Sequence, residues 1–318
     1  MILIADSGST KTDWAIVTAS HQPVVISTQG LNPIHQSREQ IVQVIREEFI
    51  GQMGSNADVK KLRSASILTH DFPMAVYFYG SGVRPEMERL MTSLLRELFP
   101  QAAVVEAHSD LLGAARALCQ RREGIACILG TGANSCFYDG REIVRHTPAL
   151  GYILGDEGSG AVLGKRFLHD LYSGILPDDI LRAFEDETGL SLPEIIRRVY
   201  REPLANRFLA SLSEFISRHL GDPGIHRVVV QNFVDFLQVH IRPYGRFDLP
   251  YPLSEVSLFI IRMSLARPFG SWVSSLVSFS RLRWLVSCVI IRVRDKVSVA
   301  SDPGAGCWKF CKNLRFFF

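Results

Sequence analysis

The chain has 318 residues, of which 47% are hydrophobic and 21% charged, a composition that suits one large or two ordinary globular domains. This balance excludes a disordered chain, a collagen-like repeat and a disulfide scaffold. The formal net charge is +3, but residues 1–248 carry 25 basic and 29 acidic residues, whereas residues 249–318 carry 10 basic and 3 acidic ones. The first 248 residues are therefore mildly acidic, and no nucleic acid is expected as a partner.

The N-terminal and apolar segments predict a cytoplasmic protein without membrane contact. Residues 1–6 have no basic start and reach Asp6 after five residues, unlike a signal peptide. Apolar stretches near the C-terminus are interrupted by arginines before they reach the roughly 18 uncharged residues of a spanning helix. Buried free thiols are expected at Cys119, Cys127 and Cys136, which lack the paired spacing of metal ligands.

The first predicted elements are β-strands on either side of a turn of small residues. Apolar runs at 3–5 and 13–17 predict a hairpin, and residues 23–26 predict a third strand. Ser37 followed by Gln40 is a capping-box pattern, which predicts the start of a helix that continues to about residue 49. Further strands are expected at 75–79 and 102–105, with a helix at 86–99 between them.

The same order of elements begins again about 120 residues later. A strand at 125–129, a glycine turn and strands at 135–138 and 142–145 are followed by a helical pattern from 159 to about 237. This helical pattern is interrupted at Gly174, Gly189, Pro203 and Asp222–Gly224. The repetition predicts an internally duplicated α/β protein whose halves pack around a shared cleft.

The two turns contain residues that suit phosphate binding. Small side chains let backbone N–H groups converge on phosphate oxygens, and the carboxylate of Asp6 can hold Mg²⁺ directly or through water. The candidates are Asp6, Gly8, Ser9, Thr10 and Lys11 in the first turn and Gly130, Thr131, Gly132 and Asn134 in the second. For either turn alone, a plain hairpin turn remains an equal alternative. Neither turn is a Walker loop, and neither opens a helix as a dinucleotide-binding loop does.

Five segments occur in the order of a known family: Asp6–Trp14, Tyr77–Gly82, Ser109–Arg116, Gly130–Ser135 and Leu154–Gly160. From residue 1 to about 250, the chain resembles the BadF/BadG/BcrA/BcrD ATPase family and specifically its N-acetylglucosamine kinase-like branch. The resemblance implies a duplicated RNase H-like α/β fold of the actin, Hsp70 and sugar kinase type, with ATP and Mg²⁺ in a central nucleotide cleft. The expected domains are residues 1–108 and 109–250, followed by an aberrant tail at 251–318.

The resemblance also implies ATP-dependent phosphorylation of a sugar hydroxyl, with N-acetylglucosamine or a related amino sugar as the substrate. Asp110 takes the position of the general base, which accepts the proton of the attacking hydroxyl. Asp156 and Asn32 take positions that bind sugar hydroxyls. Each has a structural alternative: Asp110 or Asp156 can cap the helix that follows, and Asn32 precedes a proline as in ordinary turns. No functional role is expected for His35, His108 and His146. The oligomeric state is not predicted, and a homodimer is one possibility.

A second activity within the family is an ATPase coupled to a partner protein. Its dehydratase-activating members hold an iron–sulfur cluster through cysteine thiolates. Because residues 151–166 contain no cysteine, this activity is the alternative rather than the main expectation.

The C-terminal segment lacks two motifs that the family has. The motif expected near residue 253, Phe-Val-Gly-Ser-Val-Ala, closes the adenine pocket, and the other is a terminal Ser-Pro-Met-x-Gly-Leu. Read in a shifted frame, permitted codons for 253–260 encode Val-Gly-Ser-Val-Ala-Phe-His, and those for 281–286 encode Ser-Pro-Met-Ala-Gly. We therefore expect a frameshift at about residue 251, which would leave a catalytically impaired product; a divergent tail is the alternative.

Overall fold

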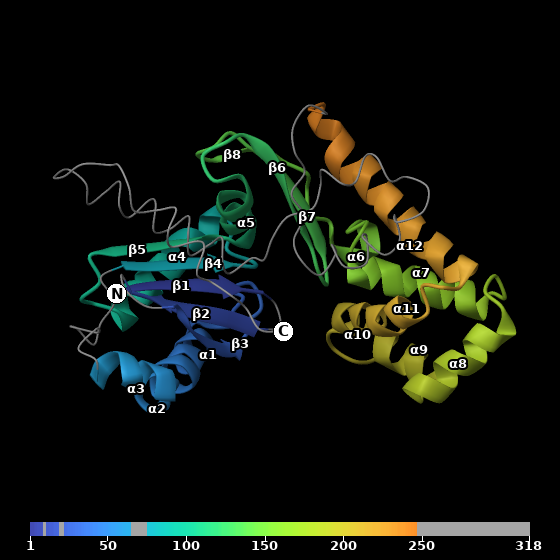
Figure 1. The fold of residues 1–318 in the computed structure, drawn as a ribbon, viewed down its shortest axis with the longest axis horizontal. Helices are drawn as coiled ribbons and strands as arrows, with labels where there is room; N and C mark the ends of the chain where they lie inside the picture. Colours follow the sequence, from blue (N-terminus) through green and yellow to red (C-terminus); the bar gives the residue numbers. More distant parts are fainter. Residues whose placement is uncertain (9–10, 19–21, 65–74, 247–318) are drawn as a thin grey trace. The chain divides into compact units, whose positions relative to one another are not determined.

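The computed structural model describes residues 1–8, 11–18, 22–64 and 75–246. The described chain forms two compact units that meet in sequence between Gln120 and Arg121 (Figure 1). Ser9 and Thr10 of the first turn, and the segment expected to be out of frame, lie outside the described residues. The domain boundaries expected from the sequence stay a prediction.

A five-stranded sheet with the order β3-β2-β1-β4-β5 forms the centre of the first unit. Its strands are β1 (Ile2–Ser7), β2 (Lys11–Val17), β3 (Val24–Gln29), β4 (Ala75–Gly80) and β5 (Val104–Ser109). β1 pairs antiparallel with β2 and parallel with β4, and β5 continues the parallel half. The predicted hairpin is thus confirmed. β5 begins later than predicted because a turn, in which Ala102 N–H donates to Phe99 O (3.0 Å), precedes it.

Helices cover the sheet of the first unit and close its core. They are α1 (Arg38–Val44), the π-helix η1 (Ile45–Ile50), α2 (Gly51–Ser55), α3 (Ala57–Ser64), α4 (Pro85–Leu98) and α5 (Asp110–Cys119). The predicted capping box of α1 is confirmed: Ser37 Oγ accepts the Gln40 N–H, and Gln40 Oε1 accepts the Ser37 N–H. Trp14 is fully buried and stacks on Phe49 with ring centroids 4.5 Å apart, so α1–η1 is fixed against β2.

The second unit begins with a smaller sheet of the same strand pattern. β6 (Gly124–Leu129), β7 (Ala133–Tyr138) and β8 (Ile143–His146) form an antiparallel meander in the order β6-β7-β8. The β6–β7 hairpin repeats the β1–β2 hairpin, and β8 takes the place of β3. The repetition predicted from the two glycine turns is therefore present in the strands.

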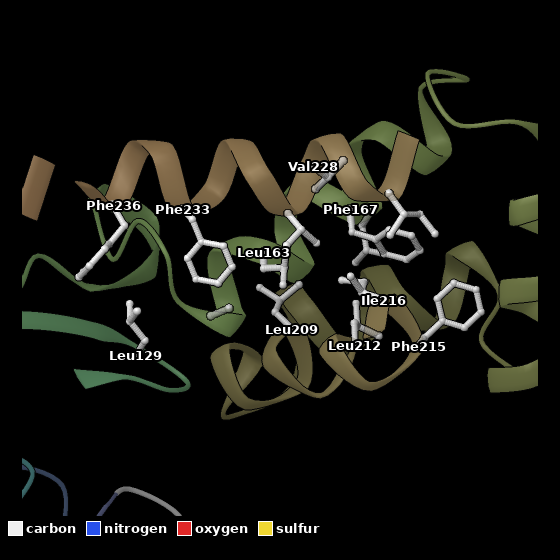
Figure 2. Packing of buried hydrophobic residues seen from close by; sticks show 14 of the residues in the cluster. Leu129, Leu163, Phe167, Leu209, Leu212, Phe215, Ile216, Val228, Phe233 and Phe236 are labelled. Atoms are coloured by element: carbon white, nitrogen blue, oxygen red, sulfur yellow. The ribbon is translucent and has the colours of Figure 1, made fainter. Parts of the chain in front are cut away.

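Helices follow this sheet over the whole range in which the sequence has helical periodicity. They are α6 (Gly151–Leu154), α7 (Gly160–Tyr172), α8 (Asp178–Thr188), α9 (Leu192–Tyr200), α10 (Ala205–Ser211), α11 (Ser213–Arg218), α12 (Pro223–Phe236), the π-helix η2 (Leu237–Ile241) and the 3-10 helix η3 (Arg242–Tyr244). Figure 2 shows the core they share, in which Leu163 and Phe167 of α7 face Leu209 of α10 and Phe233 of α12. In the part of the chain that the structure describes, no helix is long and apolar enough to cross a membrane.

Candidate functional site

The candidate residues of the first unit gather where the parallel strands β1, β4 and β5 end. Ser7, Gly80 and Ser109 lie opposite one another across these strands. The chain therefore leaves the sheet at one edge into the first turn, into the Gly80–Gly82 turn and into α5. Such an edge, at the carboxyl ends of parallel strands, is where α/β proteins commonly bind ligands.

The first turn is closed by its backbone. Gly8 N–H donates to Lys11 O (2.9 Å), and Asp6, the candidate Mg²⁺ ligand, is half-buried directly before the end of β1. The Lys11 ammonium is largely exposed and lies 2.9 Å from Asp13. Lys11 is therefore held at the start of β2 by an ion pair on its own strand.

Ser7 is a functional candidate that sequence reasoning missed. Its hydroxyl is fully buried, donates to Leu31 O (3.0 Å), accepts the Leu31 N–H (3.0 Å) and lies 2.6 Å from Thr12 Oγ1. Its carbonyl accepts the Ser81 N–H (2.8 Å). Ser7 thus fixes the first turn, the loop that carries Asn32 and the Gly80–Gly82 turn to one another. Its place inside the Asp-Ser-Gly segment was the only sequence signal.

Asn32 lies buried against the Gly80–Gly82 turn. Its side-chain oxygen accepts the Ile34 N–H (2.9 Å), and its own N–H donates to Gln36 Oε1 (2.7 Å). A Cβ on Gly82, whose φ is +79°, would lie 2.2 Å from the Asn32 side-chain oxygen. Asn32 therefore does serve the turn chemistry that the sequence offered as an alternative role. The same loop also places Asn32 at the edge where β1, β4 and β5 end.

Asp110 is the first residue of α5, and it is not the N-cap. Ser109 takes the cap position, and its hydroxyl accepts the Leu112 N–H (3.2 Å). The alternative in which Asp110 caps the helix is thus wrong. A half-buried carboxylate in the first turn is stabilised by the positive end of the helix dipole.

Two of the family-like segments pack against each other beneath Asp110. A Cβ on Gly113 would lie 2.8 Å from the Tyr79 ring, and Arg116 Nη1 donates to Tyr79 OH (3.0 Å). The guanidinium also lies over the Tyr79 ring, 5.8 Å from its centroid. α5 is therefore held close on β4, which fixes the position of its first residue.

The second turn is held by the helix that follows the loop around Asp156. Gly130 N–H donates to Gly132 O (2.9 Å) across the turn. Gly130 O and Thr131 O accept N–H groups from Gly160 and Ala161 at the start of α7 (2.8 and 3.2 Å). Asn134, at the start of β7, accepts the Ser135 N–H with its side-chain oxygen (2.9 Å). The turn itself leads from strand to strand, as predicted.

Asp156 lies directly on this turn. Its carboxylate accepts N–H groups from Ala133 and Gly151, and a Cβ on Gly132 would lie 3.0 Å from its Oδ2. Burial raises the pKa of Asp156 above its usual value, although a charge on His240 and the two N–H donors act in the opposite direction. Asp156 is not the cap of α7, because Ser159 occupies that position and accepts the Val162 N–H.

Other titratable groups lie outside the candidate residues of the first and the second unit. Cys119, Cys127 and Cys136 are buried free thiols, as predicted. Among the described residues, no three His, Cys, Asp or Glu side chains form a metal-binding cluster. His108 lies between Glu88 of α4 (3.1 Å) and Glu106 of β5 (3.4 Å). His240, which the sequence did not single out, is buried beside Glu157.

Comparison with known proteins finds relatives among solved structures and among known sequences. No family model matches the chain. A candidate N-acetylglucosamine kinase from Porphyromonas gingivalis is 41% identical, with a TM-score of 0.80, over 91% of this chain and 98% of the other. A candidate N-acetylglucosamine kinase from Chromobacterium violaceum, 20% identical with a TM-score of 0.66 over 91% and 98% of the two chains, shares the fold. An N-acetylmuramic acid/N-acetylglucosamine kinase from Clostridium acetobutylicum is 25% identical over 226 residues, which are 67% of this chain and 68% of that one.

Proposed function

Because the chain belongs to the N-acetylglucosamine kinase-like branch of the BadF/BadG/BcrA/BcrD ATPase family, we propose that it transfers the γ-phosphoryl group of ATP to a hydroxyl of N-acetylglucosamine or a related amino sugar. Its fold is the duplicated RNase H-like fold of the actin, Hsp70 and sugar kinase type, as the sequence predicts. Proteins of this branch are phosphotransferases.

The observation that carries the proposal is the place of Asp110 at the start of α5. The carboxylate follows β5 at the edge shared with the first turn and with Asn32. A carboxylate there can accept the proton of the attacking hydroxyl while the new bond to phosphorus forms and the bond between phosphorus and the ADP oxygen breaks.

The phosphate groups would bind at the two glycine turns. We assign Gly8 to Lys11 in the first turn, together with Gly130, Thr131, Gly132 and Asn134 in the second. Asp6 would hold Mg²⁺, directly or through water. One carboxylate beside a phosphate-binding turn fits this ion, which takes its remaining ligands from water and phosphate oxygens. When bound, Mg²⁺ neutralises the charge that develops on the transferred group.

The sugar would be held by Asn32 and Asp156. The side-chain oxygen of Asn32 already accepts a backbone N–H, so its amide nitrogen is the group we assign to a sugar hydroxyl. Asp156 is anchored by two backbone N–H groups, and its remaining acceptor positions suit sugar O–H donors.

Substitution of the proposed base tests the chemistry. In Asp110→Asn, made in the protein with its reading frame restored beyond about residue 251, sugar-dependent ADP formation is expected to fall by at least about a thousandfold, while ATP binding by calorimetry stays within about twofold. Ser109→Ala is the matched control, because it removes the cap of the same helix and leaves the carboxylate. Turnover in Asp110→Asn within tenfold of the unsubstituted protein would remove Asp110 as the base.

A further inference from the structure

One face of α12 and η2 contacts the loop that carries Asp156. Asn232, Phe236 and His240 follow each other at intervals of four residues, so they lie on one face of the helix. They are 0%, 1% and 2% exposed. All three meet the Gly155–Ser159 loop, and we call them the backing stripe.

Asn232 makes two hydrogen bonds to the backbone of this loop. Its oxygen accepts the Gly158 N–H (3.3 Å), and its nitrogen donates to Ser159 O (3.3 Å). The Gly158 N–H is buried and would lose this partner without Asn232, whereas Ser159 O also accepts the Leu163 N–H (2.9 Å). Asn232 thus fixes the loop backbone two and three residues after Asp156.

Phe236 packs where the loop turns back. Gly158 has a φ of +86°, and a Cβ there would lie 2.7 Å from the Phe236 Cβ. The loop and α12 therefore approach each other as closely as a glycine permits. The Phe236 ring stacks on the His240 ring with centroids 5.2 Å apart and planes at 24°, so the aromatic part of the stripe forms one surface.

His240 binds the residue next to Asp156. Its Nε2 lies 3.1 Å from Glu157 Oε2, and because an ionised carboxylate only accepts, Nε2 is the donor. Its backbone carbonyl accepts the Ser135 hydroxyl of β7 (2.9 Å). His240 therefore connects Glu157 to the sheet that carries the second turn. Its Nδ1 is buried without a hydrogen-bond partner in the described structure.

We propose that Asn232, Phe236 and His240 are positioning residues, which hold the Gly155–Ser159 loop so that Asp156 keeps its carboxylate against Gly132 and binds the sugar. The part of the inference that concerns sugar binding rests on the proposed function. The part that concerns the position of the loop rests on the contacts described above. The stripe comes from a helix more than 70 residues further along the chain, so sugar affinity depends on residues that touch no substrate.

The kinetic test compares His240→Leu, His240→Gln and Val228→Ala in the full-length protein with its reading frame restored beyond about residue 251. His240→Leu keeps the apolar contact with Phe236 and removes the bond to Glu157, so we expect the KM for N-acetylglucosamine to rise about tenfold, with kcat and the KM for ATP within about twofold. His240→Gln returns an N–H donor and is expected to restore most of the affinity. Val228→Ala is the matched control, because Val228 is buried on α12 in the same core (Figure 2). An equal rise in the sugar KM in Val228→Ala would overturn the proposal.

Hydrogen exchange tests the position of the loop without any activity. Exchange of the Gly158 amide is expected to accelerate at least about tenfold in Asn232→Leu and in His240→Leu, and not in Val228→Ala. Unchanged exchange in both stripe variants would contradict the proposal. If the protein phosphorylates no sugar, the proposed function fails, and the exchange result still decides whether the stripe holds the loop. Where Asn232→Leu does not fold, the His240 variants carry the same test.

Discussion

Asp156 combines two features that reduce the stability of the folded protein. It is a non-glycine residue with a φ of +58°, and burial raises the pKa of its carboxyl group. Neither feature serves to cap α7, since Ser159 does that. A left-handed backbone conformation and a buried carboxyl group at one residue are typical of a binding site, where the geometry is maintained at the expense of stability.

Asp156→Asn is therefore expected to stabilise the protein while it weakens sugar binding. Asparagine tolerates the left-handed conformation and has no charge to bury. We expect the Tm at pH 7 to rise by about 2 °C. Because the folded pKa lies above the unfolded one, the unsubstituted protein loses stability as the pH rises through the folded pKa. The difference in Tm should thus shrink on acidification below that pKa, and thermal denaturation between pH 4 and pH 8 measures it. A lower Tm for the variant at pH 7 would contradict the prediction.

Ser7→Ala should destabilise the first unit. The substitution leaves the buried Leu31 N–H and carbonyl without their hydroxyl partner, so we expect a loss of about 1–3 kcal/mol in the free energy of unfolding. Ser27→Ala is the control, because its hydroxyl makes one exposed bond to Asp13, and its effect should stay below about 0.5 kcal/mol. Equal losses in urea denaturation would remove the special role of Ser7.

The sequence predicted the charged residues of the candidate site, but not the residues whose hydrogen bonds fix the loops and turns around them. Asp6, Asp110 and Asp156 stand in local motifs, and such motifs are visible along the chain. Ser7, by contrast, bonds a residue 24 positions away, and Asn232 and His240 bond residues 73 and 83 positions away. Contacts over such separations are set by the packing of whole elements, which periodicity does not encode.

At the scale of elements, the crossing of α7 and α10 depends on Gly164. A Cβ at Gly164 would lie 2.0 Å from the backbone oxygen of Leu209, and neither helix backbone can yield without a shift of the other. The side chains beside this crossing, Leu163 and Leu209, belong to the core shown in Figure 2. The close approach lets α7, whose first residues hold the second turn, pack directly on α10.

Gly164→Ala is accordingly expected to cost at least about 3 kcal/mol in the free energy of unfolding, despite the higher helix propensity of alanine. The matched control is Gly221→Ala in the same unit, where an added Cβ meets no atom within 4 Å. There the stability should stay equal or rise by up to about 1 kcal/mol. Chemical denaturation of both variants measures the difference. A stable Gly164→Ala variant would mean that the two helices can separate.

Elements with strong local signals were predicted closely. The capping box at Ser37, the two hairpins and the glycine and proline interruptions between α7 and α12 all follow from side-chain chemistry within a few residues. The alternatives in which Asp110 or Asp156 caps the following helix are wrong, because a nearby serine, which is an equally good N-cap, takes the cap position of α5 and of α7. Because Ser109 and Ser159 cap these helices, Asp110 and Asp156 are left for other roles.

At the scale of the whole molecule, the charge of +3 divides into a mildly acidic part and a basic segment. The described residues end at 246, before the basic segment begins, so the frameshift expected at about residue 251 stays a prediction. The gene sequence tests it: a one-base shift there should restore the Val-Gly-Ser-Val-Ala and Ser-Pro-Met-Ala-Gly motifs. An intact reading frame without these motifs in a close relative would contradict the frameshift.

Duplication of the hairpin explains why the two glycine turns have similar chemistry. β1–β2 and β6–β7 are each antiparallel pairs followed by a third antiparallel strand. A turn at the same place in each repeat gives one phosphate-binding candidate per unit. This feature was accessible from the sequence because it depends on the order of strands and not on how the units pack.

Sugar-dependent ADP release is the measurement that tests the central proposal most directly. With ATP and Mg²⁺, ADP formation by the protein with its reading frame restored beyond about residue 251 is expected to rise at least about tenfold when N-acetylglucosamine is added, with one phosphorylated sugar formed per ADP. An ATPase coupled to a partner protein would instead release ADP at the same rate with and without any amino sugar, and that result would contradict the assignment as a sugar kinase.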